Sequence, residues 1–136
     1  MNLQQPVIVY VEDDENSALV MKMVIERVMG LQTLHILKNS PDFMRQVKGL
    51  GVIPDLFLLD IQMQPYDGFE LLSMLRSDPQ FDNSRMVALT AGVMNEEVLR
   101  LKRSGFDGAI AKPLNIDVFP DLIAKIMNGE SVWYIA

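Results

Sequence analysis

The sequence contains no cysteine, and this absence excludes two classes of structure. Disulfide bonds and thiolate metal sites both need cysteine sulfur, so neither is available here and nothing indicates an oxidising compartment. Basic residues are also few. The chain has 12 Lys and Arg residues against 18 Asp and Glu residues, which gives a formal net charge of −6. Nucleic-acid phosphates are bound by clustered Lys and Arg, so we expect no direct contact with nucleic acid.

Long apolar segments are missing as well. No run approaches the roughly 18 apolar residues that a membrane-spanning helix needs. Residues 1–6 lack the basic and apolar regions of a signal peptide, so we expect no membrane association and a cytoplasmic location. What is present is 49% hydrophobic content in 136 residues, enough for one domain with a sizeable core.

We therefore expect a single domain over residues 1–136, with its core in about 7–128. The last residues, 129–136, form an apolar tail that either folds back on the domain or meets a partner. Within the core, five short apolar runs have the form typical of strands buried on both faces of a parallel sheet. These runs are 7–11, 34–37, 56–59, 86–89 and 109–111.

Longer segments with helical spacing separate the runs. In the first of them, apolar residues recur at steps of three and four, typical of one helix face: Leu19, Val20, Met23, Val24 and Val28. The alternation of strand and helix predicts an α/β fold, a right-handed doubly wound sheet of five parallel strands.

Residues at the expected helix ends agree with this alternation. Asp67 followed by Glu70 predicts a capping box, and Asn95 suits a helix start. Gly105 stands where a helix should end. Pro120 would remove a hydrogen bond if Asn115 capped the last helix, so that helix is expected to start late or irregularly.

Polar side chains with phosphoryl-transfer chemistry stand where the apolar runs stop. They are Glu12, Asp13, Asp60, Thr90 and Lys112. Carboxyl ends of parallel strands open into one crevice, so we expect these groups to meet there. Three carboxylates at one place repel one another, and their oxygens suit a hard divalent cation such as Mg²⁺. The pattern predicts a metal-assisted phosphoryl-transfer site.

The order and spacing of four short motifs resemble a known family. The motifs are Val11-Glu12-Asp13-Asp14, residues 58–63 with Asp67-Gly68, Ala88-Leu89-Thr90-Ala91, and Ala111-Lys112-Pro113. The chain thus resembles the receiver domains of two-component response regulators, in particular the single-domain chemotaxis type. The resemblance covers nearly the whole chain and implies a flavodoxin-like (βα)5 fold with strand order 2-1-3-4-5.

The resemblance also implies a role for the acidic residues and the metal. Asp60 is expected to accept the phosphoryl group on its carboxylate. Asp13 would bind Mg²⁺ directly and Glu12 through water, and Asp60 and the backbone carbonyl of Gln62 would complete the protein ligands. Asp14 is expected to cap the first helix or face solvent.

The remaining site residues would contact the phosphoryl group or transmit its presence. The resemblance implies that Thr90, Ala91 and Lys112 bind the phosphoryl oxygens, that Thr90 moves toward them as a switch, and that the Lys112–Pro113 peptide is cis. Ala109 is atypical, because the family often has Tyr, Phe or His there. With no ring to turn, we expect Thr90 and the loop 91–95 to carry the change.

Three functions remain open at this point. The leading one is a signalling phosphoacceptor rather than an enzyme, with only self-catalysed phosphotransfer and autodephosphorylation. A Mg²⁺-dependent aspartyl-phosphate phosphatase usually has a second Asp two residues after the nucleophile, where this chain has Gln62. A phosphorylation-independent interaction domain would be expected to have lost part of the acidic set, and none is lost.

The partners follow from the leading function. The phosphodonor would be a histidine kinase or a histidine phosphotransfer protein, and the output protein is not identified by the sequence. A homodimer is also open, through the face of the fourth helix, fifth strand and fifth helix or through the C-terminal tail.

Overall fold

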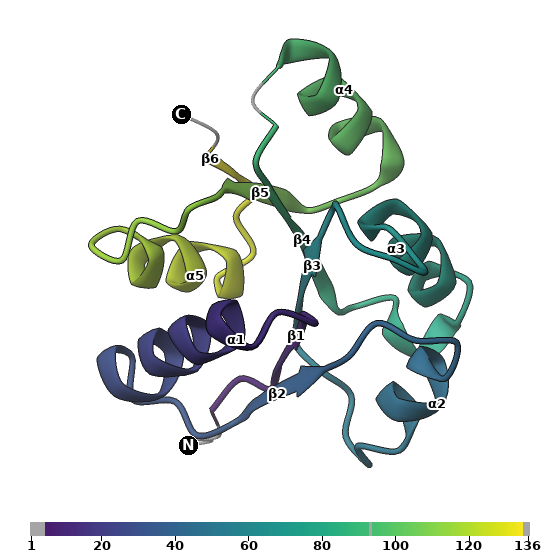
Figure 1. Cartoon of the computed structure of the whole chain (residues 1–136), viewed down its shortest axis with the longest axis horizontal. Helices are drawn as coiled ribbons and strands as arrows, with labels where there is room; N and C mark the ends of the chain where they lie inside the picture. Colours follow the sequence, from purple (N-terminus) through teal and green to yellow (C-terminus); the bar gives the residue numbers. More distant parts are fainter. Residues whose placement is uncertain (1–4, 93, 135–136) are drawn as a thin grey trace.

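The structure, a computed structural model, describes residues 5–92 and 94–134. A parallel sheet with the order β2-β1-β3-β4-β5-β6 forms the middle layer, and helices cover both of its faces (Figure 1). The strands are β1 (Ile8–Val11), β2 (Leu34–Leu37), β3 (Leu56–Asp60), β4 (Arg85–Thr90), β5 (Gly108–Ala111) and β6 (Val132–Tyr134). The five predicted strands are therefore present, each within one residue of its expected start and end.

Helical segments connect the strands. They are α1 (Glu15–Lys22), α2 (Phe43–Lys48), α3 (Gly68–Arg76), α4 (Asn95–Ser104) and α5 (Phe119–Met127), with a π-helical segment η1 (Met23–Val28) and a 3-10 turn η2 (Pro79–Phe81). Among the described residues, no helix is long and apolar enough to cross a membrane.

The core consists of two layers, one on each face of the sheet. Alternate residues of β3 serve opposite layers, because successive side chains of a strand point to opposite faces. Leu56 and Leu58 join the layer formed with α1, η1 and α5, whereas Phe57 and Leu59 join the layer formed with α2, α3 and α4. Burial on both faces explains why these strands read as continuous apolar runs.

The predicted helix ends are confirmed. Asp67 and Glu70 form a reciprocal capping box at the start of α3. Gly105 ends α4 with φ at +102°, a left-handed conformation that favours glycine. The last helix does start late, at Phe119, which places Pro120 in its first turn, where the missing N–H has no intrahelical partner to lose.

The prediction of five strands is wrong, because the sheet has a sixth. β6 pairs in parallel with β5, from Gly108 opposite Val132 to Ile110 opposite Tyr134. Residues 132–134 of the apolar tail therefore fold back on the domain, and Val132 is only 8% exposed. Burial of an apolar side chain is the physical reason, since it stabilises a strand too short to stand out in the sequence. Ile135 and Ala136 lie outside the described residues.

The apolar face predicted for the first helix is also wrong in part. Leu19 is 65% exposed and Val28 is 56% exposed, although both belong to the predicted stripe. Of the predicted stripe only Val24 is buried, together with Met21 and Ile25, which the prediction left out. Met21, Val24 and Ile25 are themselves three and four residues apart, so this segment has apolar residues at helical spacing on two sides, and most of the predicted stripe belongs to the exposed side.

Gly108 makes the pairing of β5 with β6 sterically possible. A Cβ atom at this position would lie 2.4 Å from the carbonyl oxygen of Val132. We expect Gly108→Ala to displace β6 and to lower the free energy of unfolding by about 1–3 kcal/mol, the usual cost of overpacking. Chemical denaturation followed by the fluorescence of Trp133, the single tryptophan, measures both effects.

Gly49→Ala is the matched control. Gly49 has a φ of −71°, which alanine adopts, and a Cβ atom there would lie 3.2 Å from the carbonyl oxygen of Arg45 rather than 2.4 Å from a backbone atom, so this variant should change stability much less than Gly108→Ala. Equal stability of the Gly108→Ala protein and the wild type would contradict the tight packing of β6 on β5.

Candidate functional site

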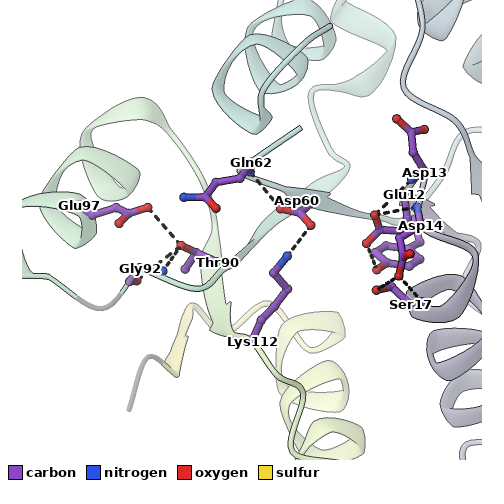
Figure 2. Close-up of polar contacts among 11 residues, drawn as sticks. Glu12, Asp13, Asp14, Ser17, Asp60, Gln62, Thr90, Gly92, Glu97 and Lys112 are labelled. Atoms are coloured by element: carbon purple, nitrogen blue, oxygen red, sulfur yellow. Dashed lines mark hydrogen bonds and ion pairs between the residues drawn. The ribbon is translucent and has the colours of Figure 1, made fainter. Parts of the chain in front are cut away.

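The predicted site residues lie at the carboxyl ends of neighbouring strands. Asp60 is the last residue of β3, Thr90 is the last residue of β4, and Lys112 follows β5 directly. Glu12 and Asp13 follow β1. Because parallel strands end at the same edge of the sheet, these side chains come from one side of the molecule (Figure 2).

Asp60 is held by two donors. The Lys112 ammonium donates to Oδ2 at 2.5 Å, and the backbone N–H of Gln62 donates to Oδ1 at 2.9 Å. Asp60 is 4% exposed, so its charge is balanced by the ammonium in a place with little water. The Lys112–Pro113 peptide is cis, as the resemblance implied, and the Gln64–Pro65 peptide is cis as well.

Glu12 is buried, and both of its carboxylate oxygens accept hydrogen bonds from within the chain. The Tyr10 hydroxyl donates to Oε1 at 2.6 Å, and the backbone N–H groups of Asp13 and Asp14 donate to Oε2 at 3.1 and 3.3 Å. Tyr10 was not singled out in the sequence, although residues two apart on a strand share a face. Burial raises the pKa of Tyr10, and the hydrogen bond to Glu12 and the charge of nearby carboxylates raise it further.

Asp13 is tied to the loops that follow the neighbouring strands. Its Oδ1 accepts the backbone N–H of Asn39 at 2.9 Å. Asn39 is itself only 7% exposed, and its side-chain amide donates to the carbonyl of Tyr66. The loops after β1, β2 and β3 are therefore linked through one asparagine, which the sequence analysis did not identify.

The side chain of Asp14, unlike its backbone N–H, points to the first helix rather than to Glu12. Its carboxylate accepts the backbone N–H of Ser17 at 2.9 Å and the Ser17 hydroxyl at 2.7 Å, which caps α1. These two hydrogen bonds lower the pKa of Asp14. The expectation that it caps the first helix is confirmed.

The prediction that three carboxylates gather around one metal ion is wrong for the described part of the chain. In residues 5–92 and 94–134, no three acidic, His or Cys side chains gather closely enough to hold a metal ion. Mg²⁺ keeps several of its waters and commonly uses only one or two carboxylates, so two carboxylates and a backbone carbonyl would be enough to bind it. The residues that would hold the ion are Asp13, Asp60 and the carbonyl of Gln62. Binding by Glu12 through water stays a prediction.

Thr90 has a partner that the sequence analysis missed. The Thr90 hydroxyl donates to Oε1 of Glu97 on α4 at 3.2 Å and accepts the backbone N–H of Gly92 at 2.9 Å. Figure 2 shows Lys112 pointing toward Asp60 and Glu97 pointing toward Thr90. Ala91 is exposed at the end of β4. In the sequence, Glu97 reads only as an acidic residue near a helix start.

Ala109 carries no ring, but the added strand places one beside it. Ala109 is fully buried and lies opposite Trp133 in the register of β5 and β6. Trp133 packs against the same core layer as Ala109, and the Lys102 ammonium of α4 lies 5.2 Å from its ring centroid. The ring at this edge of the sheet therefore comes from β6, which the sequence did not reveal.

Comparison with known proteins agrees with this geometry. The family model "Response regulator receiver domain" matches residues 8–124. The polar-differentiation response regulator DivK of Brucella anthropi is 27% identical over 123 residues, which cover 89% of this chain and 95% of that protein. Hybrid signal transduction histidine kinase I of Dictyostelium discoideum is 25% identical over 135 residues, 98% of this chain but only 8% of that much longer protein.

A solved structure shows the same fold. The signal receiver domain of a signal transduction histidine kinase from Syntrophus aciditrophicus superposes with a TM-score of 0.78 and 26% sequence identity. The superposition covers 92% of each chain.

The hydrogen bond between Tyr10 and Glu12 has a measurable effect on stability. Tyr10→Phe leaves the buried Glu12 carboxylate without this donor, so the free energy of unfolding near pH 8 should fall by about 1.5–3 kcal/mol. In the unfolded wild type Tyr10 ionises near pH 10, whereas the folded state keeps its proton. Wild-type stability therefore falls above pH 10, and the difference from the variant should shrink there.

Urea unfolding from pH 8 to 11 measures this difference. Tyr134→Phe removes another phenol hydroxyl, one that makes no hydrogen bond within the described residues, and should change stability by about 0.5 kcal/mol or less. A constant difference between wild type and Tyr10→Phe across this pH range would argue against the raised pKa.

Proposed function

The chain belongs to the response regulator receiver domain family, and on that basis we propose that it is a phosphoacceptor in which Asp60 takes a phosphoryl group. The observation that carries this proposal is the buried Asp60 carboxylate, paired with Lys112 at 2.5 Å where β3 ends. A carboxylate next to a fixed cation can accept an anionic group whose charge the same cation then balances.

The proposed reaction is an in-line displacement at phosphorus. An Asp60 carboxylate oxygen attacks the phosphorus of a phosphohistidine, so a P–O bond forms while the P–N bond breaks. The electron pair of the broken bond stays on the imidazole nitrogen, which takes a proton from solvent. The product on this chain is an acyl phosphate, whose oxygens the Lys112 ammonium pairs with as a point charge.

Mg²⁺ belongs to this proposal through Asp13, Asp60 and the carbonyl of Gln62. A bound Mg²⁺ would neutralise charge on the transferring oxygens. Asp13 is oriented for this task by the Asn39 N–H at 2.9 Å, and Asp60 by the Gln62 N–H at 2.9 Å. Thr90 is the last residue of β4, the strand that pairs with β3 and its Asp60, and Ala91 follows Thr90 directly. This arrangement supports a phosphoryl-binding role for both residues.

Partners of two kinds follow from the proposal. The donor would be a histidine kinase or a histidine phosphotransfer protein, which agrees with the similarity to a hybrid histidine kinase. The output would be a protein contact or a homodimer on the face of α4, β5 and α5. In this chain β6 pairs along the outer edge of β5, so a partner at that face would also meet β6.

A Mg²⁺-dependent phosphatase is the weaker alternative. Such an enzyme needs an acid to protonate its leaving group. Gln62 occupies the position two residues after Asp60 and offers only an amide, and it contacts Asp60 through its backbone N–H. The site therefore supports a stored acyl phosphate better than rapid turnover.

The acceptor can be identified by mass. Acetyl phosphate with Mg²⁺ should add one phosphoryl group, about 80 Da, because Asp60 supplies one nucleophilic carboxylate. Asp60→Asn should abolish the addition, since an amide is a poor nucleophile. Asp82→Asn changes an exposed aspartate outside the site and should label as the wild type does. Labelling of Asp60→Asn to the wild-type extent would disprove the assignment.

The metal can be tested without phosphorylation. Isothermal titration with Mg²⁺ should show weak binding to the wild type and none to Asp13→Ala, because one of the two carboxylate ligands is gone. That variant also loses the Asn39 contact, so the titration and not the free energy of unfolding is the readout. Asp14→Asn alters a neighbouring helix cap and should still bind the ion. An unchanged titration of Asp13→Ala would refute the site.

A further inference from the structure

The hydroxyl of Thr90 is engaged by a carboxylate of the chain itself. Thr90 is 1% exposed, and Oε1 of Glu97 at 3.2 Å is the nearer of two acceptors for its Oγ1, the other being the carbonyl oxygen of Gly92 at 3.5 Å. A hydroxyl has a single proton to donate. The bond to Glu97 therefore competes with any other acceptor at this end of the sheet.

The backbone at Gly92 is shaped to admit the Glu97 carboxylate. A Cβ atom on Gly92 would lie 1.6 Å from Oε2 and 2.3 Å from Cδ of Glu97. Any side chain at position 92 would therefore have to expel the carboxylate. The Gly92 N–H donates to Thr90 Oγ1 at 2.9 Å, so the turn and the hydroxyl are held together.

Charge decides what happens when an anion binds at Asp60. Thr90 is the last residue of β4, between the strands that carry Asp60 and Lys112, and its carbonyl accepts the Lys112 backbone N–H at 2.8 Å. A phosphoryl group on Asp60 would bring negative charge toward Thr90, and the ionised Glu97 carboxylate would repel it. Only one of the two anions can hold the Thr90 proton.

Glu97 has a second place to go. Its side chain borders a cavity of about 480 Å³ whose charged lining also includes Asp67, Glu96 and Arg100. The guanidinium carbon of Arg100 lies 3.8 Å from the ring centroid of Phe69, which keeps this cation beside the cavity. Residues three apart on a helix are neighbours, so a carboxylate that leaves Thr90 finds a cation on its own helix.

We propose that Glu97 is an internal competitor for the Thr90 hydroxyl, and that an anion bound at Asp60 displaces it. In one state Glu97 holds Thr90 and fixes the start of α4 to β4. In the other state the anion at Asp60 holds Thr90, and Glu97 pairs with Arg100. This inference rests on the proposed function, because displacement needs an anion on Asp60.

Displacement of Glu97 would affect β6 through α4. Lys102 of α4 lies over the ring of Trp133, which is next to Ala109 at the edge of the sheet. Movement of α4 would change that contact. The chain would thus transmit the state of Asp60 to β6 without a ring at position 109.

Two variants remove the competitor by different means. Glu97→Gln removes the charge and keeps the shape, whereas Gly92→Ala expels the carboxylate and keeps its charge. Glu96→Gln makes the same charge change one residue earlier, on an exposed side chain that borders the same cavity but is not the one bonded to Thr90, and is the matched control for loss of charge beside Arg100. A beryllofluoride titration with Mg²⁺, followed by amide chemical shifts of residues 90–92 and 94–104, measures how easily the anion binds.

A hydrogen bond to a charged group resists displacement, so Glu97→Gln and Gly92→Ala should lower the beryllofluoride midpoint by roughly tenfold. Glu96→Gln should leave it unchanged. Equal midpoints in Glu97→Gln and the wild type would overturn the inference, as would an equal decrease in Glu96→Gln. If Gly92→Ala does not fold, the comparison of the two glutamine variants still decides.

The failure of the proposed function is recognised separately. Were the wild type to gain no phosphoryl mass and not to respond to beryllofluoride, Asp60 would not be an acceptor. The hydrogen bond between Thr90 and Glu97 would then be tested by amide hydrogen exchange of α4 in the proteins without beryllofluoride. Faster exchange in Glu97→Gln than in Glu96→Gln supports the contact, and equal exchange overturns it.

Discussion

The ion pair between Asp60 and Lys112 is the interaction on which the site depends. Asp60 is 4% exposed, and an ionised carboxylate with so little water needs a cation close by. The two residues come from strands on either side of β4, so the pair forms only while β3, β4 and β5 keep their order and register. The two core layers hold that register, and the sheet and the chemistry thus share one physical requirement.

Much of this fold could be predicted because its signals are local. Each strand is a short run buried on both faces, and the capping box of Asp67 and Glu70 needs only neighbouring residues. β6 could not be predicted in this way. Its pairing depends on the absence of a side chain at Gly108, which precedes it by more than 20 residues. The buried face of α1 and η1 was also missed, because apolar residues with helical spacing occur on both the buried and the exposed side, and periodicity does not distinguish the two.

In the site, too, some residues could be predicted from local sequence signals and others depend on tertiary structure. Asp60, Thr90 and Lys112 could be placed because strand ends share one edge of the sheet. The residues that hold this set were missed, since Asn39 and Glu97 reach it from a loop and a helix whose directions only the tertiary structure fixes. Tyr10 is different, because its position two residues before Glu12 on a strand could have revealed the contact.

Borohydride reduction of the phosphorylated protein tests the central claim most directly. An acyl phosphate is reduced to an alcohol, so aspartyl phosphate becomes homoserine, which peptide sequencing by mass spectrometry locates. The account predicts homoserine at position 60 after treatment with a phosphodonor and Mg²⁺, and none in the untreated protein. Homoserine at Asp13 or elsewhere, or a phosphate that resists reduction, would contradict the role assigned to Asp60.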